Sequence, residues 1–168
     1  VTWTSHRLTL TAAHDININA VMTASGTASL VMNTSATNGG DTGVSGGMVR
    51  VGFDANGNFT GRVDFGGRSG AGFLTINGNN YTVINALGTA GDTSAATLQG
   101  MNGDLNGYYA LGSDIDASAT AGWNGGLGFA PIAQSGTFLG AFNGLGHTIS
   151  NLTLNRPGQN KLGLFGEV

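Results

Sequence analysis

Two aspartates are the clearest candidates for catalytic chemistry in this sequence. Asp114 and Asp116 stand two positions apart, and on a β-strand this spacing places both side chains on one face. Clustered carboxylates supply the acid and the base of glycoside hydrolysis. Acid-base catalysis would also need a second cluster or a basic residue on that face, and the chain has no Lys or Arg between Arg68 and Arg156. We therefore expect both carboxylates to cap a turn or a strand end. The alternative is a polysaccharide-active enzyme that uses Asp114 and Asp116.

One serine and three histidines are weaker candidates for nucleophilic or metal chemistry. Ser45 lies in a Gly-x-Ser-x-Gly pattern at residues 43–47, but a nucleophile elbow needs a hydrophobic strand before it and a helix after it. The sequence has neither. His6, His14 and His147 are far apart and lack the paired ligands of a zinc site. We expect no catalytic, cofactor-binding or metal-binding residues, and we assign His147 a fixed place in a turn.

Residues 54–58 (DANGN) resemble the start of a calcium-binding loop. The glycine falls at the fourth position of this segment rather than the sixth, and the twelfth position is Phe65 instead of an acidic residue. Asp, Asn and Gly are also the residues that tight turns require. We interpret the segment as a turn.

Asparagine residues have two interpretations. Stacked asparagines can form ladders of side-chain amides that stabilise layers of strands, and this structural role is our default for Asn17, Asn19, Asn151 and Asn155. Asn-x-Ser/Thr triplets also meet the sequence requirement for N-glycosylation, although a chain rich in Asn and Thr produces them by chance. Such triplets begin at Asn33, Asn58, Asn80 and Asn151.

Four aromatic residues would form a carbohydrate-binding platform if they lay exposed together, because aromatic faces stack on sugar rings. Large rings in packed proteins are more often buried. We therefore expect internal positions for Trp3, Tyr108, Tyr109 and Trp123.

The composition indicates a turn-rich all-β protein with few surface charges. Hydrophobic residues make up 40% of the 168 residues and charged residues only 9%, so Ser, Thr, Asn and Gly must cover much of the surface. The net charge is −3 and the six basic residues are scattered, which leaves no basic stripe for nucleic acid. The absence of cysteine excludes disulfides and thiolate metal sites. No apolar run approaches the roughly 20 residues of a membrane-spanning helix, so we expect no membrane insertion.

Short alternating runs predict the strands that would position these residues. Such runs occur at residues 8–10, 16–18 and 30–32, then at 73–76, 81–84 and 108–111, and again within 137–154 and 162–165. Leu10 and Leu30 are one plausible solenoid repeat apart, because coils of about 20 residues are common. An apolar strand so close to the last residue, and a first residue other than Met, suggest a fragment of a longer chain.

The middle of the chain predicts a β-hairpin. The segments 48–53 and 59–65 both alternate, and Asn56-Gly57 between them suits a type I′ turn. Glycine-rich flanks at 37–47 and 66–72 suggest that this hairpin, around residues 48–65, projects from the main body. We therefore divide one structural domain into residues 1–36, a glycine-rich insertion at 37–72, and residues 73–168.

Three segments together carry a resemblance to a known family. Residues 2–20, with the run LTLTAAHDININA at 8–20, resemble the repeated strands of filamentous-haemagglutinin-like exoproteins of bacterial two-partner secretion systems. Residues 140–154 (GAFNGLGHTISNLTL) with 163–166 (GLFG) resemble the GLUG repeat of the same exoproteins. Residues 98–117 are similar to the segment that often precedes that repeat. The region from about 33 to 72 matches no part of the family.

The resemblance implies a right-handed parallel β-helix within a long, fibrous adhesin that is secreted or held at the bacterial cell surface. It implies binding to a host-cell or bacterial surface receptor or glycan, and it brings no catalytic residues and no cofactor. In this interpretation residues 1–36 form the first coils, and residues 73–168 continue the β-helix into the GLUG-type repeat. Open strand edges leave another alternative, a self-assembling extracellular filament subunit with end-to-end association.

Overall fold

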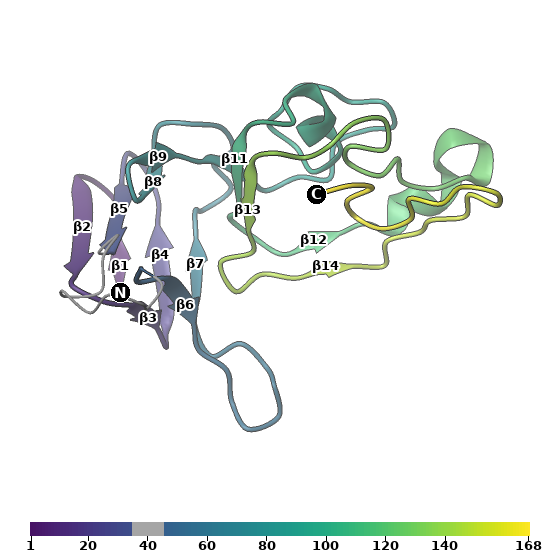
Figure 1. Ribbon diagram of the computed structural model, residues 1–168. Coiled ribbons are helices and arrows are strands. Elements are labelled where there is room, and N and C mark those ends of the chain that lie inside the picture. The colour runs from purple at the N-terminus through teal and green to yellow at the C-terminus, as the bar shows by residue number, and fades with distance from the viewer. Residues whose placement is uncertain (35–45) are drawn as a thin grey trace.

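The chain forms short strands in small sheets, in which almost all strand pairs are parallel (Figure 1). The computed structural model describes residues 1–34 and 46–168. In these residues the only regular helices are two short 3₁₀ helices, Gln99–Gly103 (η1) and Ser118–Gly126 (η2). The prediction of an all-β protein is therefore confirmed.

Three sheets make up the first region of the molecule. The first sheet contains β1 (Thr2–Trp3), β4 (Val21–Ala24) and β7 (Arg62–Asp64). The second contains β2 (Arg7–Ala12), β5 (Ser29–Thr34), β8 (Leu74–Ile76) and β9 (Asn79–Asn80). The third contains β3 (Ile16–Ile18) and β6 (Val49–Val51). The chain thus passes through the three sheets in a fixed order, and neighbouring strands of a sheet come from successive passes.

The register between β2 and β5 corrects the expected repeat. Leu8 pairs with Leu30 and Leu10 pairs with Met32, a step of 22 residues from position 8 to position 30. The prediction that Leu10 stacks on Leu30 is wrong by two residues, which keeps the same side-chain face because strands alternate with a period of two.

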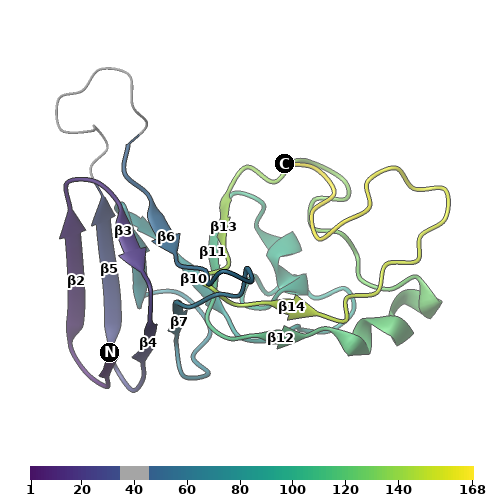
Figure 2. The same ribbon diagram turned by 90° about the horizontal axis from the view of Figure 1, so that it is seen from below.

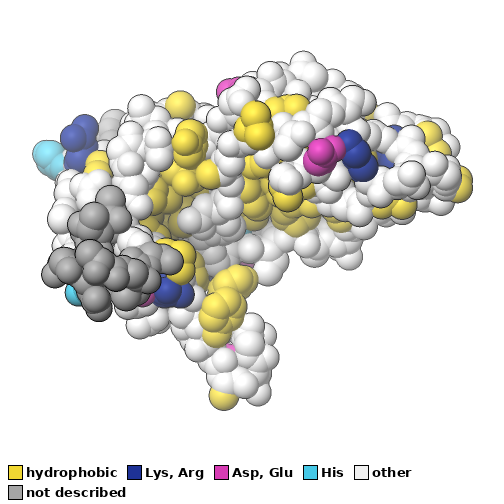
Figure 3. All heavy atoms as spheres, in the orientation of Figure 1, with side chains coloured by type: hydrophobic (Ala, Val, Ile, Leu, Met, Phe, Trp, Pro, Cys, Tyr) yellow, Lys and Arg dark blue, Asp and Glu magenta, His cyan; other side chains and the backbone are white. Residues whose placement is uncertain are grey.

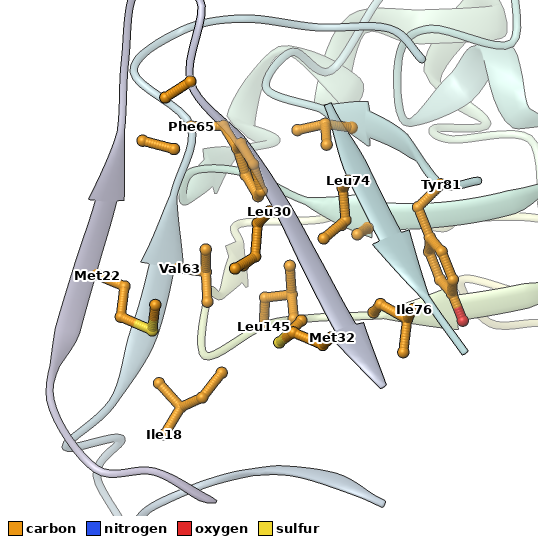
Figure 4. Packing of buried hydrophobic residues seen from close by; sticks show 14 of the residues in the cluster. Ile18, Met22, Leu30, Met32, Val63, Phe65, Leu74, Ile76, Tyr81 and Leu145 are labelled. Carbon is orange, nitrogen blue, oxygen red and sulfur yellow. The ribbon is translucent and has the colours of Figure 1, made fainter. Parts of the chain in front are cut away.

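Side chains from all three sheets point into one core (Figure 4). Leu30 and Met32 of β5 are fully buried, and Ile16 and Ile18 of β3 are buried on either side of the exposed Asn17. This alternation is the pattern of strands with one face in a core. Burial of apolar area, at about 25 cal/mol per Å², is what holds such short strands together.

The second region has two parallel sheets and its own core. One sheet contains β10 (Thr82–Ile84), β11 (Tyr108–Leu111) and β13 (Ala141–Asn143). The other contains β12 (Ile115–Asp116) and β14 (Ile149–Ser150). The core of this region includes Tyr109, Phe129 and Ile132, all almost fully buried. The two regions lie side by side along the molecule (Figure 2).

Strand β7 joins the two regions. The N–H of Val63 donates to Leu145 O at 3.0 Å, and the N–H of Phe65 donates to Gly112 O at 3.0 Å. The side chain of Leu145, 1% exposed, packs into the core of the first region. The turn after β13 therefore closes one side of the first core.

The predicted hairpin is correct only at its tip. Residues 52–60 project from the body (Figure 1), with Phe53 and Phe59 in an antiparallel bridge and Gly57 at φ +82° in the turn. The strands on either side do not pair with each other. β6 pairs in parallel with β3, and β7 with β4, because their apolar faces are buried in the common core.

One other local prediction needs correction. Residues 162–165 do not form a strand, and only Phe165 makes a bridge, to Ile132. No sequence pattern indicates η2, because its Gly, Ala and Ser residues resemble a loop and its interior includes left-handed positions at Asn124 and Gly125.

Candidate functional site

Asp114 and Asp116 act as anchors for backbone and side-chain donors of the neighbouring pass of the chain. Both are exposed on either side of the buried Ile115, so the expected shared face is present. Asp114 Oδ1 accepts the N–H of Thr148 at 2.9 Å, and Asp116 Oδ1 accepts the amide of Asn151 at 3.0 Å. The Thr148 N–H lowers the pKa of Asp114, and the Asn151 amide lowers the pKa of Asp116. A catalytic acid would need a raised pKa.

The same bonding pattern occurs at Asp15. Its Oδ1 accepts the N–H of Met48 at 2.8 Å, while the N–H of Ile16 donates to Met48 O at 3.0 Å. In the second region the N–H of Ile115 likewise donates to Thr148 O at 2.9 Å. We call each pattern an aspartate clamp: an aspartate directly before a strand holds the residue directly before the next parallel strand. The sequence signal is the dipeptide Asp-Ile, which occurs at 15–16 and 114–115.

His147 lies between two carboxylates at the junction of the regions. Its side chain is 2% exposed, and Nε2 lies 2.9 Å from Val63 O, to which it must donate because a carbonyl only accepts. Asp64 Oδ1 is 3.6 Å from Nε2, and Asp114 Oδ1 is 3.4 Å from Nδ1. These residues line a hollow of about 250 Å³. Because Nε2 is bonded to the backbone carbonyl of Val63, His147 holds the turn after β13 in place, which is the role expected from the sequence.

The other candidates for chemistry do not assemble into a site. Ser45 lies outside the described residues. His6 and His14 are exposed and separate from His147, and within residues 1–34 and 46–168 no group of His, Cys, Asp or Glu is placed to hold a metal ion. Asp54 Oδ1 accepts the N–H groups of Asn56 and Asn58 at 2.8 and 2.9 Å. These bonds make residues 54–58 a turn.

The four aromatic residues do not gather on one surface. Trp3 packs against the first core, and Trp123 stacks on Phe129 beside the second. Tyr109 is buried and donates to Asp104 O at 2.7 Å, and burial raises its pKa to about 12. Tyr108 is 37% exposed. Internal positions were expected for all four rings; Tyr109 is buried, Trp3 and Trp123 are half-buried, and Tyr108 is exposed.

The expected asparagine ladder is not formed. Asn17 is aligned with Arg50 of the neighbouring strand rather than with another asparagine. Asn151 donates to Asp116, and Asn155 donates to Gly126 O at 3.5 Å. Successive passes of the chain differ in length, with steps of 22 residues from Leu8 to Leu30 and 44 from Leu30 to Leu74, so the asparagines do not align with one another. Among the four sequons, Asn58, Asn80 and Asn151 are exposed.

Buried polar side chains were missed by the sequence analysis. The amide of Gln99, 1% exposed, donates to Ala130 O and accepts from Ala130 N, both at 3.1 Å, and so takes the place of a strand neighbour. The hydroxyl of Thr120, fully buried, donates to Ala117 O at 2.6 Å and accepts from Thr153 N at 2.9 Å. No local pattern marks either residue, because Ala130 and Thr153 are about 30 residues away from them in the sequence.

A groove of about 500 Å³ was also missed. It lies between β6 and the turn 143–146, and Phe53 and Phe59 are among its lining residues. Hydrophobic side chains are visible where the projecting hairpin leaves the body (Figure 3). The two phenyl rings are 4.8 Å apart, and Phe53 is 63% exposed. Neither ring belongs to either core.

Comparison with known proteins gives one partial similarity. Halomucin of Haloquadratum walsbyi is 46% identical to this chain over 84 residues, which cover 45% of the chain and 1% of halomucin. The chain thus spans about 1% of the length of this relative. No family model matches the sequence, and no solved structure matches it. No helix in the described part of the chain is long and apolar enough to cross a membrane.

Proposed function

We propose that this chain is a structural and adhesive segment of a large secreted or cell-surface protein, folded as a right-handed parallel β-helix. The observation that carries the proposal is the repeated order of strands: β1, β2 and β3 are followed by β4, β5 and β6, each paired in parallel with its predecessor. The filamentous-haemagglutinin-like family and its GLUG repeat are part of this proposal. A far longer relative that is named as a mucin agrees with a place at the cell surface or outside the cell.

The proposed fold supplies length and resistance to unfolding rather than a reaction centre. Parallel strands stack at about 4.8 Å per layer, so each added pass extends the body while its backbone groups bond to the previous pass. The uncharged Ser, Thr, Asn and Gly surface offers many hydrogen-bonding groups for a host-cell or bacterial surface receptor or a glycan. The residues best suited to catalysis, Asp114 and Asp116, are engaged in holding neighbouring strands.

Antibodies raised against the purified chain test the location. We expect them to label intact cells of the source organism, or the material those cells release, without permeabilisation. Labelling that appears only after lysis would contradict the proposal.

Three measurements on the purified chain test the mode of action. Beads coated with the folded chain should bind to cells, and beads coated with heat-unfolded chain should bind less; equal binding would remove the adhesive role. Electron microscopy of the chain distinguishes an adhesive segment from the filament alternative, which requires linear polymers.

Incubation of the chain with a panel of neutral and acidic glycans tests the enzyme alternative. We expect no released products, and release that disappears in the variant Asp114→Asn would favour the enzyme instead.

A further inference from the structure

The third sheet of the first region lacks the third parallel strand that each of the other two sheets has. In the first sheet β7 lies beside β4, and in the second sheet β8 lies beside β5. After β8 the chain reverses into β9, which pairs antiparallel with β8, and continues to β10 in another sheet. No described strand therefore lies on the free side of β6.

The backbone of β6 has hydrogen-bonding groups directed at this free side. Ile16 N–H donates to Met48 O at 3.0 Å and Gly52 N–H donates to Ile18 O at 2.9 Å, so positions 48, 50 and 52 face β3. Successive residues of a parallel strand direct these groups to opposite sides. The N–H and C=O groups of Val49 and Val51 consequently face away from β3, and they have no backbone partner among the described residues.

The 500 Å³ groove occupies the space beside these groups. β6 forms one wall and the turn 143–146 forms the other, and the neighbouring rings of Phe53 and Phe59 line it beyond the C-terminal end of β6. Its volume lies within the range of sites that hold small ligands or short peptide segments. Backbone donors and acceptors, apolar walls and exposed aromatic rings are together the features of strand addition, in which an extended peptide joins the edge of a sheet.

The charge lining the groove indicates the chemistry of the peptide. Arg50 is the only charged residue in that lining. Its Nε donates to Asp15 Oδ2 at 2.7 Å, and its side chain is 52% exposed. A strand added beside β6 would place a residue next to Arg50 on the same outward face. An acidic residue there would pair with the guanidinium, and its two neighbours would point inward toward the apolar lining.

We propose that β6 binds, by strand addition, an extended segment of a partner polypeptide in which an acidic residue is flanked by apolar residues. A second folded copy of this chain is a poorer occupant. It would bring a whole sheet edge to β6, and that edge would collide with β7 and β8, which fill the corresponding positions of the other two sheets. A single strand meets only the groove. This inference goes beyond the proposed surface role and does not depend on it.

The test uses the whole chain and a labelled, end-capped peptide of sequence Thr-Val-Asp-Val-Thr, with fluorescence anisotropy as the readout. We expect saturable binding. Replacement of the central Asp by Lys in the peptide should weaken binding several-fold at low salt. In the variant Arg50→Gln the two peptides should bind equally. Absence of saturable binding by the wild-type chain, or equal binding of the Asp and Lys peptides, would overturn the proposal.

The variant Val51→Pro tests the geometry. Proline removes the N–H that faces the groove and leaves the bonds from positions 50 and 52 to β3. We expect at least a tenfold loss of peptide affinity, while the matched control Val51→Thr, which keeps the N–H, should bind like the wild type. Circular dichroism checks that both variants fold. Unchanged affinity in a folded Val51→Pro variant would contradict strand addition.

Amide hydrogen exchange gives an independent measurement that needs no variant. In the free chain the N–H of Arg50 should exchange slowly and those of Val49 and Val51 quickly, and the peptide should slow the latter two. Slow exchange at Val49 and Val51 in the free chain would mean that the groove is already filled. A concentration-dependent dimer whose formation is blocked by Val51→Pro would identify a second copy as the occupant. Either result would overturn the proposal.

Discussion

Aspartates serve as strand connectors at the scale of single residues. In each aspartate clamp a carboxylate oxygen accepts a backbone N–H that would otherwise lack a partner at the start of the next strand. Bonds from N–H groups to a carboxylate are stronger than those between neutral groups. Asp114, which looked like a catalytic acid in the sequence, is therefore explained by the hydrogen bond that begins β14, and Asp15 has the same role at the start of β6.

The clamps predict that acid destabilises the fold. Hydrogen bonds lower the pKa of Asp15, Asp114 and Asp116 below the usual value of 3.8 in the folded state. The folded state then binds fewer protons than the unfolded state, so the contribution to stability is full above the unfolded pKa and is lost as the pH falls through the folded pKa. Urea midpoints measured from about pH 6 down to about pH 2.5 should fall below about pH 4.

The control for this prediction is Asp114→Asn, which should reduce the steepness of the acid limb because one titrating clamp is removed. A urea midpoint that stays constant across the same pH range would show that the carboxylates do not contribute to folding.

Thr120 gives a second prediction at this scale. Its hydroxyl is fully buried and bonds to Ala117 O and Thr153 N. Thr120→Val keeps the shape and leaves the N–H of Thr153 without a partner, whereas Ala117 O keeps its bond from the backbone N–H of Thr120. The unpaired N–H should lower the free energy of unfolding by about 1–3 kcal/mol. Thr120→Ser retains the hydroxyl and should cost less. Equal urea midpoints for the two variants would mean that the hydroxyl contributes nothing.

At the scale of elements, close approach between successive passes decides where glycine is required. Gly140 precedes β13, and a Cβ there would overlap the carbonyl oxygen of Gly107, which precedes β11. The strands β11 and β13 are paired in register from Tyr108 and Ala141 onward. A side chain at position 140 would therefore push the start of the two strands apart.

Gly140→Ala should consequently destabilise the second region by about 1–3 kcal/mol, the usual cost of overpacking. Gly122→Ala is the matched control, because a Cβ at that position meets nothing within 4 Å. Thermal unfolding of both variants measures the difference. Similar melting temperatures would indicate that β11 and β13 can shift without cost.

At the scale of the whole molecule, the two regions are joined by backbone bonds and by side chains of the second region that pack into the first core, among them Val83, Ala110 and Leu145. Leu145 comes from the second region but fills the first core, and Val63 and Phe65 of the first region donate to Leu145 and Gly112. Contacts of this kind should make the two regions unfold as one cooperative unit.

The tryptophans report each region separately, since Trp3 lies beside the first core and Trp123 beside the second. In single Trp→Phe variants, the remaining fluorescence transitions in urea should coincide. Leu145→Ala should lower the free energy of unfolding by about 2–5 kcal/mol through loss of packing. Leu139→Ala, at a residue 73% exposed, is the control and should have little effect. Separate transitions in the wild-type chain would show that the regions fold independently.

The sequence by itself determined the strands and the turns, because alternation of apolar and polar side chains and the conformations of Gly and Asn are local properties. It placed β3 and β11 correctly, and it indicated that Asp114 and Asp116 share an outward face. Only the tertiary structure decided which strands pair. The partners of β7 and β8 are β4 and β5, about 40 residues earlier, and this choice depends on which faces can close a common core. The same closure brings Leu145 into the first core and leaves β6 with a free edge. No local pattern encodes either result.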